Sequence, residues 1–89
     1  MSSKVELGNQ SLHLLNDPAF RQAIVRVEQS IFSRWSAQGL TSEERDAEYY
    51  KLQAVLDVKT ALAAQVADGR MEVAANEAKA RAAATTQGK

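Results

Sequence analysis

Two oppositely charged side chains, Glu28 and Lys59, are set among apolar residues and could form an ion pair. Glu28 lies between Ile24 and Phe32 on a predicted helix surface, and Lys59 interrupts an apolar stripe that includes Leu62. Buried charges are costly unless they are paired. The two residues lie at different levels of the two predicted helices, so such a pair would have to join two protomers. The alternative, which we favour, is that both stems cover apolar surface while both charged heads reach water.

Four aromatic residues fall close to the predicted turn between the helices: Phe32, Trp35, Tyr49 and Tyr50. Such a group could stack on a nucleic-acid base. At helical spacing, however, aromatic side chains more often form core and interface, and this is the function that we expect for them.

Residues for catalysis or metal binding are scarce. The chain has no cysteine, and His13 is its single histidine, with no second ligand or nucleophile beside it in the sequence. Arg21, Arg26 and Arg34 point in three directions around the first predicted helix, and no phosphate-binding loop or hydrolase motif is present. The sequence therefore predicts a protein that is not an enzyme and that has no metal and no cofactor.

Charge and hydropathy limit the binding partners and the location that we expect for this protein. Eleven basic and eleven acidic residues give a formal net charge of zero, which argues against general nucleic-acid or anionic-membrane binding. No apolar run approaches membrane-spanning length, and the N-terminus lacks the apolar region of a signal peptide. We therefore expect a soluble protein of the cytoplasm.

The first long helix is predicted over residues 17–38. Asp17 is suited to be its N-cap, and Pro18 to be its first residue. Gly39 is expected to close the helix with a positive φ, with Leu40 packing against Trp35 in a Schellman cap. An apolar stripe at spacings of three and four residues marks its buried face: Phe20, Ile24, Val27, Ile31 and Trp35. Val25 and Phe32 add a second row, so this apolar face is wide enough for two neighbours.

The second helix is predicted from residue 42, after a capping box formed by Thr41 and Glu44. It runs to residue 68, and Gly69 then ends it, kinks it or merely softens it. The alanine-rich segment 70–84 favours a continued or restarted helix, and residues 85–89 are predicted to fray.

Residues 1–16 are predicted to form an arm that lies on the helices. Gly8 to Ser11 resemble a loop, and one short turn is expected over residues 12–15. In an antiparallel pair with its turn near residue 40, everything from Ala63 onward overhangs. The apolar residues of this overhang need a cover, either from the arm or from another protomer.

The predicted fold is therefore all-α: an antiparallel two-helix hairpin with a long alanine-rich second helix, assembled into a homo-oligomeric helical bundle. A chain of 89 residues without disulfide or metal has little core of its own, and small chains often compensate by association. The candidate oligomer interface comprises Phe20, Ile24, Val25, Glu28, Phe32, Trp35, Lys59, Leu62, Val66 and Val73.

Several short runs resemble small helical proteins encoded by tailed bacteriophages and prophages. They are the run Asp17 to Phe20, Trp35 before the turn, Arg45 followed by residues 49–56, and Asp68-Gly69. In size and hairpin architecture the chain is also similar to the phage anti-defence sponges, which form compact oligomers and sequester cyclic oligonucleotides. The first resemblance implies a phage accessory or virion-assembly protein, in the infected bacterial cytoplasm or on the virion, that contacts itself and another phage or host protein. The second implies a cyclic nucleotide bound between protomers.

Overall fold

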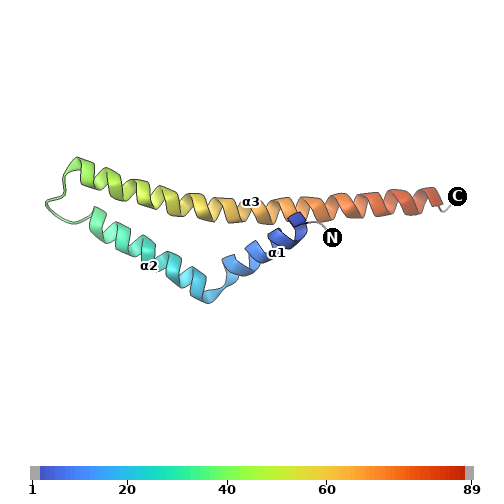
Figure 1. The fold of residues 1–89 in the computed structure, drawn as a ribbon, viewed down its shortest axis with the longest axis horizontal. Coiled ribbons are helices and arrows are strands. Elements are labelled where there is room, and N and C mark those ends of the chain that lie inside the picture. The colour runs from blue at the N-terminus through green and yellow to red at the C-terminus, as the bar shows by residue number, and fades with distance from the viewer. Residues whose placement is uncertain (1–2, 88–89) are drawn as a thin grey trace.

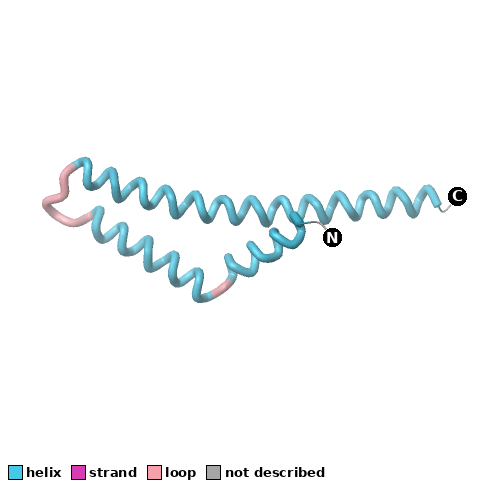
Figure 2. Tube along the Cα trace, viewed as in Figure 1, coloured by secondary structure: helices cyan, strands magenta, loops and turns pink. Residues whose placement is uncertain are grey.

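The computed structural model describes residues 3–87, and the side chains of residues 3–84. This part of the chain forms three helices: α1 spans Ser3–Asn16, α2 spans Pro18–Trp35 and α3 spans Ser42–Gln87. Loops separate the helices at two places, a single residue after α1 and a longer turn after α2 (Figure 2). The prediction of an all-α chain is confirmed.

The start of α2 agrees with the sequence, but its end does not. The Asp17 carboxylate accepts a hydrogen bond from the Phe20 amide at 2.9 Å, which confirms the predicted N-cap. The helix ends at Trp35, three residues earlier than predicted. Ser36 is the C-cap, and its hydroxyl donates to the Phe32 carbonyl at 2.8 Å. Because Ser36 ends the helix, the predicted Schellman cap at Gly39 is wrong.

The turn between α2 and α3 agrees with the prediction at Thr41 and Glu44 but differs from it in the position of Gly39. Gly39 has a φ of 83°, so the positive φ is confirmed, but it lies within the turn and not at the helix end. Thr41 and Glu44 form the predicted capping box. The Glu44 amide donates to the Thr41 hydroxyl, and the Thr41 amide donates to the Glu44 carboxylate, each at 3.1 Å.

The N-terminal arm is a helix and not a loop with one short turn, so that prediction is wrong. Gly8 lies inside α1, where it faces Gly69 of α3, and both glycines are buried. A Cβ atom on Gly8 would lie 2.9 Å from the Gln65 carbonyl oxygen and 3.1 Å from the Gly69 Cα. The two helices therefore touch through their backbones, and the glycines serve this close approach rather than a loop.

Polar side chains support the same crossing. The buried Ser11 hydroxyl lies 2.6 Å from the Gln65 side-chain oxygen and 2.8 Å from the Leu7 carbonyl, within hydrogen-bonding distance of both. α1 covers Val66, which is 9% exposed. The arm thus supplies the cover for this part of α3, one of the two sources that the sequence left open.

α3 continues through Gly69 without a break and is 46 residues long. Figure 1 shows that α1 reaches only the middle of α3, so the C-terminal part of α3 projects alone. The residues from 74 to 84 are all exposed. The predicted fraying from residue 85 is not seen as far as Gln87, and residues 88 and 89 lie outside the described part.

The three helices form a single layer. Seen down the shortest axis of the molecule, α2 lies beside α3 and only the start of α1 overlaps α3 (Figure 1), and the dimensions are 76 × 25 × 15 Å. The radius of gyration is 20.5 Å, whereas a compact chain of this length would have about 12 Å. Among the described side chains, Ile31 and Val66 are the only large apolar ones that are buried. The fold therefore has almost no core of its own.

Candidate functional site

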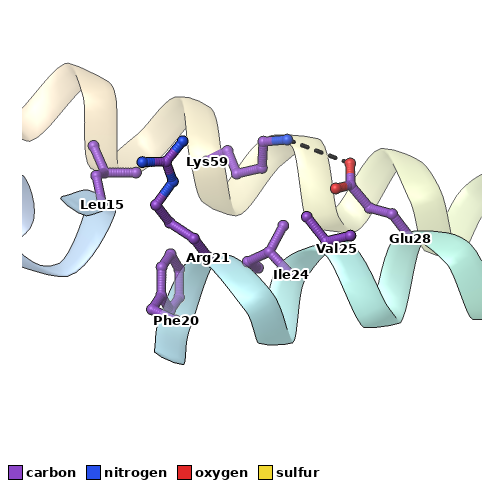
Figure 3. Close-up of a pocket in the computed structure, with 7 residues that line it drawn as sticks. All are labelled: Leu15, Phe20, Arg21, Ile24, Val25, Glu28 and Lys59. Carbon is purple, nitrogen blue, oxygen red and sulfur yellow. Dashed lines mark hydrogen bonds and ion pairs between the residues drawn. The ribbon is translucent and has the colours of Figure 1, made fainter. Parts of the chain in front are cut away.

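A groove opens where the chain bends between α1 and α2. Both helices diverge from α3 near this bend and leave a space of about 300 Å³ (Figures 1 and 3). Its floor is apolar and its rim is charged. The groove is lined by Leu15, Phe20, Arg21, Ile24, Val25, Glu28 and Lys59.

Glu28 and Lys59 meet across this groove within one chain. The Lys59 ammonium donates to Glu28 Oε2 at 3.3 Å (Figure 3). The inference that such a pair would need two protomers is therefore wrong. The favoured alternative, that both charged heads reach water, holds in part, because the two side chains are 39% and 29% exposed. Side chains lean toward the N-terminus of their own helix. In this antiparallel pair, Glu28 and Lys59 lean toward each other, and their length spans the difference in level.

Arg21 is the other cation of the groove. Figure 3 shows its side chain rising from α2 toward α3, with the guanidinium on the far side of Lys59 from Glu28. Within the described residues it has no ion pair or hydrogen bond from its side chain. The groove thus holds two cations and one carboxylate, which gives its rim a positive balance.

A second, almost wholly apolar pocket lies nearer the turn, with a volume of about 190 Å³. The rings of Phe32 and Trp35 stack there with their centroids 6.1 Å apart. They remain 64% and 43% exposed, and Tyr49 is 50% exposed. The aromatics are therefore not a core in this chain, and only an interface could bury them. The pocket is lined by Ile31, Phe32, Trp35, Glu48, Tyr49 and Leu52.

Glu48 is a residue that the sequence reasoning missed. It is 8% exposed, and its Oε1 accepts from Lys51 at 3.0 Å and from Arg34 at 3.1 Å. The hydrogen bond from Lys51 lowers the pKa of Glu48 from its ordinary value, desolvation opposes this, and Arg34 adds to the lowering. Oε2 is buried and has no partner in the described residues. The sequence did contain a signal for the burial of Glu48. This residue precedes Val55 by seven residues and so lies on the same apolar stripe as Lys59.

A third groove, of about 160 Å³, runs beside the crossing of α1 and α3. Val73 is 39% exposed here and Leu12 is 37% exposed. The groove is lined by Val5, Gly8, Asn9, Leu12, Val66, Gly69, Arg70 and Val73.

The first two grooves lie on one side of the helical layer. Val25, Glu28, Phe32 and Trp35 line them from α2 at spacings of three and four residues, which is one helix face. The α3 residues of these grooves follow the same spacing, and Leu56 continues it. We call this side the groove face and define it by Val25, Phe32, Trp35, Tyr49, Leu52 and Leu56.

The opposite face of the layer is less apolar. Val27 follows Val25 by two residues, about 200° around the helix, and is 45% exposed. Val58 on α3 is 51% exposed. Arg34 and Lys51, which hold Glu48, lie beside them. Of the exposed aromatic rings, Phe32, Trp35 and Tyr49 line a pocket of the groove face, whereas Tyr50, which is 68% exposed, lies outside that pocket.

The structure separates the candidate interface residues into two groups. Ile24, Glu28, Lys59 and Leu62 are partly buried between the helices of one chain, and Val66 is covered by α1. The others remain accessible to a second molecule to different degrees. These are Phe20, Val25, Phe32, Trp35 and Val73.

The described residues offer little for other kinds of site. His13 is exposed on α1, and the described residues contain no group of three or more potential metal-ligating side chains. None of the described helices combines the length and the apolar character that crossing a membrane requires. No family model, curated protein or solved structure matches the chain. The exposed apolar side chains of the groove face are therefore the main structural basis for proposing a function.

Proposed function

We propose that this chain is a non-enzymatic helical protein that associates with itself and acts through protein–protein contacts. The observation that carries the proposal is the accessible surface of 6962 Å². A folded monomer of 9.7 kDa would expose about 5,100 Å². Part of the excess belongs to the projecting end of α3, and the rest to the two faces of the layer. Association would remove this apolar surface from water.

The setting that we propose is that of a small phage accessory or virion-assembly protein. Its support is the sequence resemblance of the Asp17 to Phe20 run and of Trp35 to small phage helical proteins. A single helical layer with an apolar face suits a part that is completed by its neighbours. The partners would be other copies of the chain and a phage or host protein.

An alternative is supported by the groove at the bend between α1 and α2. Arg21 and Lys59 line it together with the ring of Phe20, and cations with an aromatic ring suit an anionic base-containing ligand. Under this alternative the chain sequesters a cyclic oligonucleotide between protomers. Absorbance of the purified protein near 260 nm, followed by mass spectrometry of any released ligand, separates the two proposals.

Self-association is tested by light scattering on the purified chain at micromolar concentration. We expect a mass of at least twice the 9.7 kDa of one chain. A dilution series should show helix content and mass falling together, because the helices need the contact to stay folded. A monomer that unfolds cooperatively would contradict the proposal.

A further inference from the structure

We infer that a second copy of this chain docks on the groove face, about a two-fold axis that lies in the plane of the interface and passes near Phe32 and Leu52. The inference rests on the proposed self-association and adds which face is used. Its occupant is argued from two features: the exposed area and the difference between the two faces.

The area is sufficient for such a contact. The chain exposes about 1,800 Å² more than a compact monomer of its mass, while a standard interface buries about 800 Å² on each partner. An interface of standard size is therefore smaller than this excess, part of which belongs to the projecting end of α3.

The apolar side chains select the groove face. Phe32 is 64% exposed, Tyr49 is 50% exposed and Val25 is 49% exposed. Aromatic anchors in a desolvated centre are typical of strong interfaces. The pocket between Phe32, Trp35 and Tyr49 is open to receive a side chain from the second copy. On the opposite face, Val27 and Val58 lie beside the charged Arg34 and Lys51 instead of beside aromatics.

The face is tested with two matched variants, Val25→Lys and Val27→Lys. Both replace a half-exposed valine of α2, and the two positions point to opposite faces. We expect Val25→Lys to weaken the association measured by light scattering at least about tenfold, because a lysine would be buried without a partner. Val27→Lys should leave the mass unchanged. Retained mass in Val25→Lys, or equal loss in both variants, would overturn the inference.

Cysteine cross-linking tests the face without depending on the lysine variants. The chain has no cysteine of its own. Oxidised Phe32→Cys should form a covalent dimer because this position lies near the axis, whereas Val58→Cys on the opposite face should not. Dimers of Val58→Cys, or none of Phe32→Cys, would overturn the inference.

The outcomes also separate this inference from the proposed function. A wild-type chain that is monomeric at micromolar concentration contradicts both. A wild-type oligomer that persists in Val25→Lys contradicts the groove face alone and leaves self-association standing.

Discussion

α3 is packed in two different ways along its length, by α1 in its middle and by α2 in its first half. α1 is four residues shorter than α2 and still makes the more extensive contact. At its crossing, Gly8 and Gly69 let the backbones touch. α2 contacts α3 through longer side chains, among them the pairs Glu28–Lys59 and Arg34–Glu48. It leaves two grooves open.

The size of the residue at the contact explains the difference. Where no Cβ separates the helices, their backbones come into direct contact, and a groove of about 160 Å³ remains beside the crossing. Where charged side chains separate them, the space between the helices is incompletely filled. The α1 contact buries Val66 within one chain, whereas the α2 contact leaves the aromatic rings of Phe32 and Trp35 exposed to a second molecule. Three experiments test this contrast, in order of decreasing expected effect.

The largest effect is expected from Gly8→Leu. Leucine favours helix over glycine, so a freely exposed site would gain stability. At the crossing, the Cβ atom alone would come within 2.9 Å of the Gln65 carbonyl oxygen. We expect a net loss of about 1–3 kcal/mol in the free energy of unfolding, measured by denaturant titration at fixed protein concentration.

The matched control for this variant is Gln10→Leu, on the exposed side of the same helix. Its effect should stay within about 0.5 kcal/mol. If Gly8→Leu were as well tolerated as Gln10→Leu, the close crossing of α1 and α3 would be refuted.

A smaller effect is expected for the ion pair of the α2 contact. The side chains of Lys59 and Glu28 are 39% and 29% exposed, so solvent screens their attraction. A double-mutant cycle with Glu28→Gln and Lys59→Met should give a coupling of about 0.5–1 kcal/mol. Since the pair lies within one chain, the coupling should be the same at low and high protein concentration. A coupling that appears only at high concentration would move the pair to an interface between protomers.

The smallest effect concerns the pH dependence at Glu48. Its pKa is lowered in the folded chain from the ordinary 4.5, chiefly by the hydrogen bond from Lys51. The unfolded state therefore binds a proton first as the pH falls, so this stabilisation is complete well above pH 4.5 and is lost as the pH falls through the folded pKa. Thermal midpoints of wild type and Glu48→Gln should converge as the solution is acidified through this range. A difference that does not change with pH would show that the charge of Glu48 contributes nothing.

The sequence-based predictions of the fold were most accurate for interactions between residues that are close together in the chain. The N-cap at Asp17, the capping box of Thr41 and Glu44, and the positive φ of Gly39 were predicted correctly. The helix end at Trp35 was missed because Ser36 also caps locally, and two plausible end signals competed within four residues. The loop predicted at Gly8 was wrong because glycine is a loop signal only when its backbone has no close neighbour.

The candidate site shows the same limit. Exposed aromatics near the turn were expected to be core or interface, and the structure leaves Phe32 and Trp35 outside any core of this chain. The pairing of Lys59 with Glu28 within one chain was not predicted, because contact was expected only between residues at the same height along the two helices. Both side chains are long and lean toward each other, so they meet despite the difference in height. Glu48 was overlooked, although its place on the apolar stripe was visible.

The sequence by itself determined where α2 and α3 begin, because caps, proline and glycine act through hydrogen bonds and dihedral preferences spanning only a few residues. Tertiary structure alone decided that Gly8 meets Gly69, that Ser11 meets Gln65 and that Glu28 meets Lys59. These contacts depend on how the helices tilt and approach each other. Helix approach is set by the sum of many side-chain volumes across the layer, and no local segment of sequence contains that sum.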